Sequence, residues 1–185
     1  MNRKLLLGIT VVLVAAAVIF ALVMQRRVPK SFTAAPIIGK AALGQPAPNF
    51  RALTTHGLFV LDKAKKPVLL EVFATWCPHC QHETIALNKL YRRFGKRIDF
   101  VAVSGSTMAM DGQSPENQVD VLAFANRFHV RYPIAYDPTL KVANSYLQGG
   151  FPTIVAINRA KKIVYLQSGA VPASQLVPIL QKVLP

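Results

Sequence analysis

The chain has 185 residues, of which 52% are hydrophobic and 16% charged, and its 22 Lys and Arg against 8 Asp and Glu give a net charge of +14. A chain this hydrophobic has enough apolar surface to build a core, which argues against intrinsic disorder. Its two cysteines allow at most one disulfide, which excludes a small scaffold held together by several disulfides. The location of the basic residues has to be established before a partner is inferred from the charge.

The first 42 residues differ in character from the rest. Residues 1–4 form a short basic N-terminus, and residues 5–24 are twenty consecutive residues without a charge. At about 1.5 Å per residue, a helix of that length crosses the ~30 Å hydrocarbon core of a bilayer. We therefore predict one transmembrane anchor over residues 5–24 and a linker over residues 25–42. A cleaved signal peptide is the alternative, although it usually ends in a small-x-small cleavage site, whereas residues 22–24 read Leu-Val-Met.

Part of the positive charge belongs to this N-terminal region. Six of the 22 basic residues lie within the first forty, which leaves 16 basic and 8 acidic residues, or +8, for the remainder. Basic residues beside a membrane segment usually contact anionic lipid headgroups. The charge therefore does not point to nucleic acid, and we expect none as a partner.

Residues 43–185 alternate between strand and helix patterns. Residues 67–74 and 98–103 are apolar runs typical of strands covered on both faces, and residues 78–94 have an apolar face at helical spacing. A second helix is predicted to begin at Ser114-Pro115. Its apolar side would consist of Val119, Leu122, Ala123 and Phe128. A hairpin over residues 154–157 and 162–167 and a last helix over residues 173–183 complete an α/β domain, with a central mixed sheet and helices on both faces.

Both cysteines lie in Trp76-Cys77-Pro78-His79-Cys80, after a buried strand and in the first turn of a helix. There the free N–H groups and the positive end of the helix dipole favour the Cys77 thiolate, which is the nucleophilic form. We therefore expect Cys77 to form a mixed disulfide with a substrate and Cys80 to resolve it. Pro78 suits the first helical position, and His79 can stabilise negative charge on the Cys77 sulfur.

Other uses of this Cys-x-x-Cys pair fit the sequence less well. A structural zinc would need two more ligands from only four histidines, and haem attachment would need a His where Gln81 stands. A structural disulfide of such short span would restrict little chain entropy. We predict a redox-active Cys77–Cys80 disulfide with no metal and no cofactor.

Glu71 is the only charge between Lys66 and Glu83, and it lies inside an apolar strand. A buried carboxylate without a partner is costly, or it becomes neutral. We expect a buried acid whose pKa is drawn toward neutrality and which moves the proton of Cys80. Exposure of Glu71 on an edge strand is the alternative.

Pro152 directly precedes the predicted strand over residues 154–157, although proline cannot donate to a sheet ladder. A cis Phe151–Pro152 bond in a tight turn would explain this position. A trans proline at a strand start is the alternative.

Several segments match the pattern of one family. They are Gly44-Gln45-Pro46-Ala47-Pro48-Asn49-Phe50, the Trp76–Cys80 motif with Glu83 three residues after it, Tyr132-Pro133-Ile134, Asp137-Pro138 and Gly150-Phe151-Pro152-Thr153. Together they resemble the thioredoxin superfamily and, within it, the membrane-tethered TlpA/ResA-like thiol–disulfide oxidoreductases. The resemblance implies a thioredoxin-like fold over residues 43–185 in which Pro152 is cis and packs over the Cys pair. It places Glu71 at the buried acid of thioredoxins, and Trp76, Phe151 and Thr153 around the site.

The resemblance also implies a protein thiol–disulfide oxidoreductase in the bacterial cytoplasmic (inner) membrane, with a single span and the catalytic domain in the periplasm. Its partners would be protein thiols and disulfides and a membrane redox partner that recycles Cys77 and Cys80. The anchor and the Gly150–Thr153 motif favour a reductant. Pro78-His79 resembles the oxidase DsbA, so an oxidant or isomerase is the alternative.

Copper binding by a thioredoxin-fold protein is a further alternative. Soft or imidazole ligands are available in Cys77, Cys80, Met108, Met110 and His129. The copper chaperones of the family use a wider Cys spacing, and Met108 and Met110 more simply belong to a surface loop.

Overall fold

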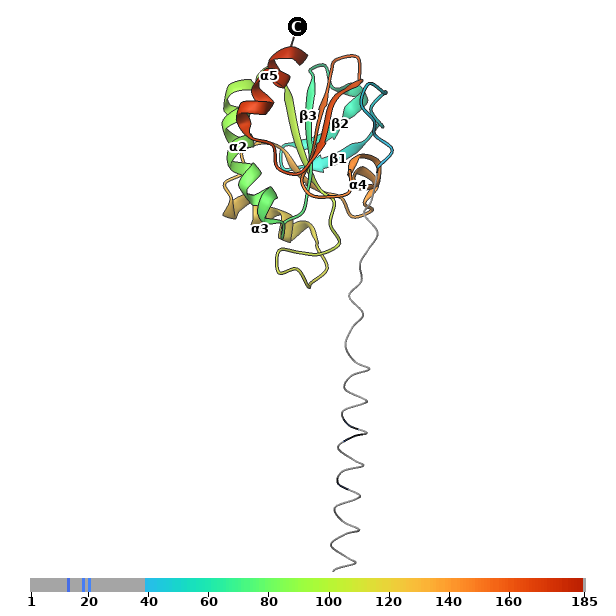
Figure 1. Cartoon of the computed structure of the whole chain (residues 1–185). Helices are drawn as coiled ribbons and strands as arrows, with labels where there is room; N and C mark the ends of the chain where they lie inside the picture. Colours follow the sequence, from blue (N-terminus) through green and yellow to red (C-terminus); the bar gives the residue numbers. More distant parts are fainter. Residues whose placement is uncertain (1–12, 14–17, 19, 21–38, 185) are drawn as a thin grey trace, which may run out of the picture. The chain divides into compact units, whose positions relative to one another are not determined.

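The computed structural model describes Leu13, Val18, Phe20 and residues 39–184, and every structural statement below refers to these residues (Figure 1). The chain has two compact units, residues 1–35 and 36–185. Apart from Leu13, Val18 and Phe20, the predicted anchor lies outside the described residues, as does the linker up to residue 38. Among the described residues, no helix is both long enough and apolar enough to cross a membrane. Residues 39–41 already hydrogen-bond to the backbone of residues 145–147.

A seven-stranded mixed sheet in the order β2-β1-β5-β4-β3-β6-β7 forms the centre of the domain. Its strands are β1 (Arg51–Thr54), β2 (Gly57–Val60), β3 (Val68–Phe73), β4 (Asp99–Ser104), β5 (Ile134–Tyr136), β6 (Thr153–Ile157) and β7 (Ile163–Ser168). β3 runs parallel to β4 and antiparallel to β6, so it lies in the interior of the sheet. Glu71 is therefore not on an edge strand, and that alternative is wrong.

Helices cover both faces of this sheet, as predicted. They are η1 (Leu61–Lys63), α2 (Pro78–Phe94), α3 (Gln118–Arg127), α4 (Lys141–Tyr146) and α5 (Ala173–Val183). Side chains alternate across β3, so Leu69 and Phe73 join a cluster with α2, α3 and α5, whereas Leu70 and Val72 join a second cluster with α4. Figure 1 shows α2, α3 and α5 on one side of the sheet and α4 on the other. Both clusters consist of residues 41–184, so the side chains of this unit form a core of its own.

Three short parts of the fold are absent from the sequence prediction. The β1–β2 hairpin, β5 and α4 have strands of three or four residues and a helix of six. Elements this short show less than two periods of any helical pattern, so hydrophobic spacing does not reveal them. Tertiary pairing forms them instead: β1 is antiparallel to β5, and β5 is parallel to β4.

The predicted start of α3 is wrong, and so is its predicted apolar side except for Phe128, which packs against the core. The helix begins at Gln118, because the Asn117 side chain accepts the N–H groups of Val119 and Asp120 while the Asp120 carboxylate accepts the N–H of Asn117. This reciprocal capping box stabilises an N-terminus more fully than Ser114-Pro115 would. Val119 is 71% exposed, whereas Val121 is fully buried.

Candidate active site

Cys77 caps the N-terminus of α2 with its own sulfur. Its backbone is extended (φ −77°, ψ 116°), and its Sγ accepts the N–H of Cys80 at 3.4 Å. The sulfur thus takes the part that a Ser or Asp oxygen takes at an ordinary N-cap. Pro78 occupies the first helical position, where a missing N–H costs nothing. The end of β3 and the start of α2 therefore fix Cys77 at the mouth of the site and Cys80 one turn behind it.

The two thiols, both reduced and buried, differ in acidity. The pKa of Cys77 falls to about 6, first because the Cys80 thiol donates a hydrogen bond to its sulfur. The N–H groups of Cys80 and His79 and the positive charge of His79 lower it further, while burial opposes them. Burial raises the pKa of Cys80 far above its ordinary value, and its bond to Cys77 and the charge of Glu71 add to that rise. At neutral pH Cys77 is the nucleophilic thiolate and Cys80 is a protonated thiol.

The turn before β6 lies against the Cys77 sulfur. The Phe151–Pro152 bond is cis, which confirms the prediction and excludes the trans alternative. The carbonyl oxygen of Phe151 lies 3.7 Å from Cys77 Sγ and accepts a hydrogen bond from it when Cys77 is protonated. The buried Thr153 hydroxyl donates to the Gly150 carbonyl at 2.9 Å, which closes the turn on itself.

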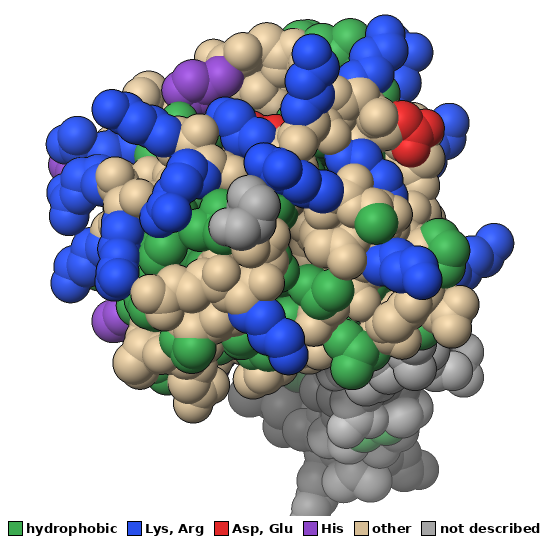
Figure 2. Space-filling model, turned by 90° about the horizontal axis from the view of Figure 1, so that it is seen from above, with side chains coloured by type: hydrophobic (Ala, Val, Ile, Leu, Met, Phe, Trp, Pro, Cys, Tyr) green, Lys and Arg blue, Asp and Glu red, His purple; other side chains and the backbone are tan. Residues whose placement is uncertain are grey.

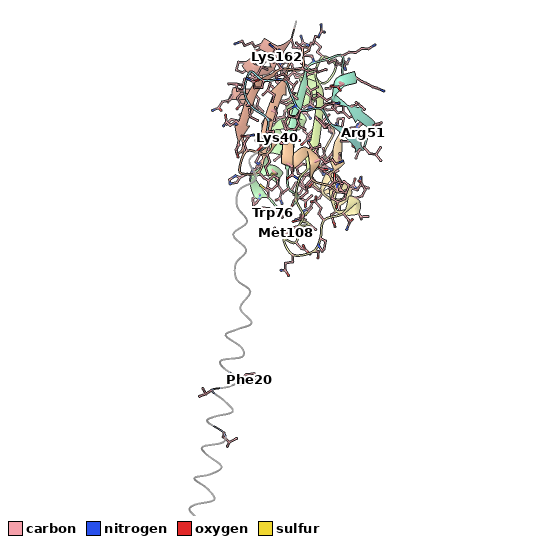
Figure 3. The ribbon with its side chains drawn as sticks, turned by 90° about the vertical axis from the view of Figure 1, so that its right-hand side faces the viewer. Phe20, Lys40, Arg51, Trp76, Met108 and Lys162 are labelled. Atoms are coloured by element: carbon pink, nitrogen blue, oxygen red, sulfur yellow. The ribbon has the colours of Figure 1, made fainter. Side chains whose placement is uncertain are left out.

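An aromatic pair borders the site on its solvent side. The rings of Trp76 and Phe151 are perpendicular, with centroids 5.9 Å apart. The indole N–H of Trp76 donates to the Ser106 hydroxyl at 2.8 Å, and that hydroxyl bonds to the backbone of Met108. Figure 3 shows Trp76 and Met108 at the same end of the domain. The surface around Cys77 is therefore apolar, with half-buried aromatic rings and an exposed methionine.

Two buried acids lie behind Cys80. Glu71 is 3% exposed, and burial raises its pKa well above the ordinary value, with the nearby charge of Glu83 as the next cause. The Tyr132 hydroxyl donates to Glu71 Oε2 at 3.4 Å, while Oε1 has no partner among the described residues. The charge of Glu71 is one of the causes that raise the pKa of Cys80, so this carboxyl lies near the Cys80 thiol.

Glu83, on α2, is the second acid and was not predicted as a site residue. It is 3% exposed, and burial raises its pKa to about 7 even though its Oε2 accepts the N–H of Val171 at 2.8 Å. Its Oε1 has no partner in the described part of the chain. A signal for it does exist in the sequence, because it falls in the same helical stripe as Cys80, Leu87 and Leu90, where an acid is unusual.

Glu116 is a third buried acid that the sequence did not reveal. The Thr75 hydroxyl donates to its Oε1 at 2.7 Å, and the Ser104 hydroxyl donates to its Oε2. Burial raises its pKa, although both hydroxyl bonds oppose that rise. It ties the loop that precedes α3 to the residue two positions before Cys77. Its surroundings in the sequence are polar and Pro-containing, so no pattern distinguishes it from a surface acid.

A family model described as Redoxin matches residues 42–184. The chain belongs to the Redoxin family. The thiol-disulfide oxidoreductase ResA of Bacillus cereus is 28% identical over 149 residues, which cover 79% of this chain and 81% of the relative. A thiol:disulfide interchange protein, thioredoxin family protein from Chlorobium tepidum TLS is 25% identical with a TM-score of 0.60, covering 78% of this chain and 99% of that one. StoA from Bacillus subtilis is 22% identical with a TM-score of 0.58, and the match covers 72% of this chain and 96% of StoA.

These likenesses confirm the resemblance to TlpA/ResA-like proteins of the thioredoxin superfamily and the thioredoxin-like α/β fold. This Redoxin-family chain is a protein thiol–disulfide oxidoreductase. Of the four residues predicted to be catalytic, Cys77 and Cys80 share the first turn of α2, Pro152 follows the residue whose carbonyl lies against Cys77, and the charge of Glu71 acts on Cys80. Pro78 and His79 are exposed at the start of the helix.

Metal ligands do not gather in the described part of the Redoxin domain: no three His, Cys, Asp or Glu side chains are placed to hold one ion. The sulfur of Met110, a ligand in the copper alternative, accepts a hydrogen bond from Arg127 at 3.5 Å. Met108 is 40% exposed on the same loop. Thiol exchange needs a nucleophilic thiolate and a second thiol, and Cys77 and Cys80 supply them.

Proposed function

We propose that this protein reduces disulfide bonds of protein substrates at the outer side of a bacterial cytoplasmic membrane, in the manner of TlpA/ResA-like reductants. The observation that carries the thiol exchange is the unequal acidity of the two thiols, with Cys77 as thiolate beside an apolar rim and Cys80 as buried thiol. The predicted anchor over residues 5–24 and the Gly150–Thr153 motif favour the reducing direction. A nucleophile at the surface and a protonated resolving thiol behind it are what stepwise disulfide exchange requires.

In the first step, the Cys77 thiolate attacks one sulfur of a substrate disulfide. The S–S bond of the substrate breaks, a Cys77–substrate disulfide forms, and one substrate thiolate leaves and takes a proton from water. In the second step, Cys80 gives its proton to the Glu71 carboxylate and attacks the Cys77 sulfur. The second substrate thiolate leaves, the Cys77–Cys80 disulfide forms, and two electrons have passed to the substrate. A membrane redox partner then returns the pair to the dithiol.

Oxidation of substrates is the second candidate, and the same geometry supports it. A pKa of about 6 for Cys77 stabilises the dithiol state relative to the disulfide, which makes the pair more oxidising. His79 contributes to this lowered pKa, and Pro78-His79 is the dipeptide that resembles DsbA. Isomerisation belongs to the same candidate, because it also begins with attack by Cys77.

Redox titration against glutathione distinguishes the two candidates. We expect a reduction potential nearer the value of about −270 mV for thioredoxin than that of about −120 mV for DsbA. A potential near −120 mV would contradict the reductant assignment and favour the oxidant. The Cys77→Ser/Cys80→Ser variant is the control, since it has no couple to titrate.

We propose a single membrane span over residues 5–24 with the Redoxin domain in the periplasm. Twenty uncharged residues of spanning length support this proposal, as does the chemistry, because a redox-active Cys pair meets disulfide substrates outside the cytoplasm. A topology reporter fused after Pro185 should be active only as a periplasmic fusion. A cytoplasmic signal would contradict the proposed orientation.

A further inference from the structure

Charge is unevenly distributed over the domain. Residues 43–184 contain 16 basic and 8 acidic residues, and eleven of the basic ones lie at one end of the sheet. We call this end the basic pole; it consists of Lys63, Lys65, Lys66, Arg92, Arg93, Lys96, Arg97, Arg159, Lys161, Lys162 and Lys182. Asp62 and Asp99 are the acids beside it, so the pole carries +9, and the five basic and six acidic residues elsewhere sum to −1.

Topology explains how four distant segments come to one end. β3 and β4 are parallel and both begin there, α2 ends there, and the turn between β6 and β7 lies opposite the start of β3 because Val68 pairs with Ile157. The Lys161 ammonium donates to the carbonyl of Ala64, which joins the β6–β7 turn to the segment before β3. Cys77 follows the other end of β3. Figure 3 shows Lys162 and Trp76 at opposite ends of the domain.

An apolar hollow lies within the basic pole. Its volume is about 730 Å³, and it lies between the β6–β7 turn and the last turns of α5. Leu43, Ile163, Val164 and Ile179 are among its lining residues, together with Arg159 and Lys182. Figure 2 looks at the domain from this direction and shows hydrophobic side chains between many Lys and Arg side chains, with few acidic ones.

We propose that the basic pole binds the surface of an anionic phospholipid membrane. Lys and Arg near such a surface each raise affinity by about fivefold, and most of the pole's basic side chains are exposed. Phosphate headgroups would meet these cations while acyl-chain carbons contact the apolar hollow, a pairing that suits the polar–apolar boundary of a bilayer. Nucleic acid fits less well, because the one aromatic ring beneath Arg93 and Arg97, that of Phe94, is 1% exposed and offers no stacking surface.

This binding mode has a consequence for catalysis. With the basic pole on the bilayer, the apolar rim around Cys77 faces away from the lipid and toward soluble proteins. The inference extends the proposed membrane location, but it is independent of residues 5–24, since it concerns the domain alone. It also explains why the excess charge of the domain is concentrated at the end farthest from the reactive sulfur.

Vesicle binding by residues 39–185, the unit with its own core, tests the inference without the predicted anchor. Pelleting with phosphatidylcholine vesicles that contain phosphatidylglycerol should capture the domain at low salt, and pure phosphatidylcholine vesicles should not. The triple variant Arg159→Gln, Lys162→Gln, Lys182→Gln should bind roughly 100-fold more weakly, from about fivefold for each charge. The matched triple variant Arg127→Gln, Arg131→Gln, Lys141→Gln has the same net charge and should bind like the wild type.

Three results would overturn the inference: no binding to anionic vesicles, equal losses in the two triple variants, or tighter binding to a random DNA duplex than to the vesicles. Circular dichroism of each protein shows whether a loss of binding comes from misfolding. Insulin reduction by each protein tests the proposed function separately. If the wild-type domain reduces insulin but does not bind anionic vesicles, only the membrane inference is contradicted. A domain that binds vesicles but exchanges no thiols contradicts only the proposed function.

Discussion

The backbone N–H of Cys80 points at the sulfur of Cys77 across 3.4 Å, so the resolving residue also stabilises the nucleophile. The Cys80 thiol donates to the same sulfur and is the largest cause of the lowered pKa of Cys77. The same interaction raises the pKa of Cys80. The two cysteines therefore separate their own acidities, and each becomes suited to a different step of the exchange.

Alkylation of Cys77 by iodoacetamide should follow a titration with a midpoint at about pH 6. Cys80→Ala should raise that midpoint by roughly one to two pH units, because a hydrogen bond to a charged group contributes about 1.5–3 kcal/mol. His79→Gln is the comparison variant and should raise it less, since His79 is the smallest of the causes. A wild-type midpoint between 8 and 9 would show that the thiolate is not stabilised.

Replacing Glu71 with Gln should slow the second step of the exchange by roughly 100-fold at neutral pH, the lower range for loss of a general base. Cys80 has a strongly raised pKa and needs an acceptor for its proton, and Gln cannot be one. The mixed disulfide on Cys77 should accumulate in stopped-flow or quench experiments, and raising the pH should restore part of the rate. Glu116→Gln makes the same change at another buried acid and should leave this step unchanged. An identical pH–rate profile in Glu71→Gln and wild type would exclude the role.

The contribution of Glu83 to the stability of the protein should fall as pH rises from about 4.5 through about 7. The pKa of Glu83 is raised from 4.5 to about 7 in the folded state, so the folded protein holds this proton more tightly than the unfolded chain does. The favourable contribution is therefore complete below pH 4.5 and is lost as the pH passes 7. Glu83→Gln should flatten this part of the profile, while Glu71, whose pKa is also raised, keeps its own contribution. Urea denaturation at several pH values measures the unfolding free energy of both proteins. If this free energy depends on pH in the same way in Glu83→Gln and wild type, Glu83 does not cause the pH dependence.

Glu116→Ala should cost about 2–4 kcal/mol of unfolding free energy, because it leaves two buried hydroxyl donors, of Thr75 and Ser104, without a partner. Glu116→Gln retains an acceptor and should cost less than half as much. Asp111→Ala removes an exposed acid that also accepts hydrogen bonds from its own loop, and its loss should be the smallest of the three. Denaturant unfolding followed by Trp76 fluorescence gives all three values. Equal losses for Glu116→Ala and Asp111→Ala would show that burial of the Glu116 network contributes nothing.

Long, continuous patterns in the sequence were enough to predict β3, α2, the β6–β7 hairpin and α5. The helix over residues 78–94 was predicted with the bounds that the structure has, because Pro78 suits the first helical position and Gly95 follows the last apolar residue, Phe94. The Cys77–Cys80 pair and the cis bond before Pro152 were also predicted, since both are features of residues that are neighbours in the chain. Glu71 was found because a charge inside an apolar strand is conspicuous.

Contacts between distant segments decided the rest. β5 and α4 exist because the sheet and its second core cluster stabilise them, and α3 starts at Gln118 because a side-chain capping box forms at Asn117. Glu116 becomes buried only when its loop folds back on Thr75. The net charge of +8 on residues 43–184, which at first pointed to no particular partner, is concentrated at one basic end of the sheet. The burial of a side chain and the charge of a surface depend on which segments come together in the fold. Chain topology decides these contacts, and local sequence patterns do not show them because the segments are far apart in the chain.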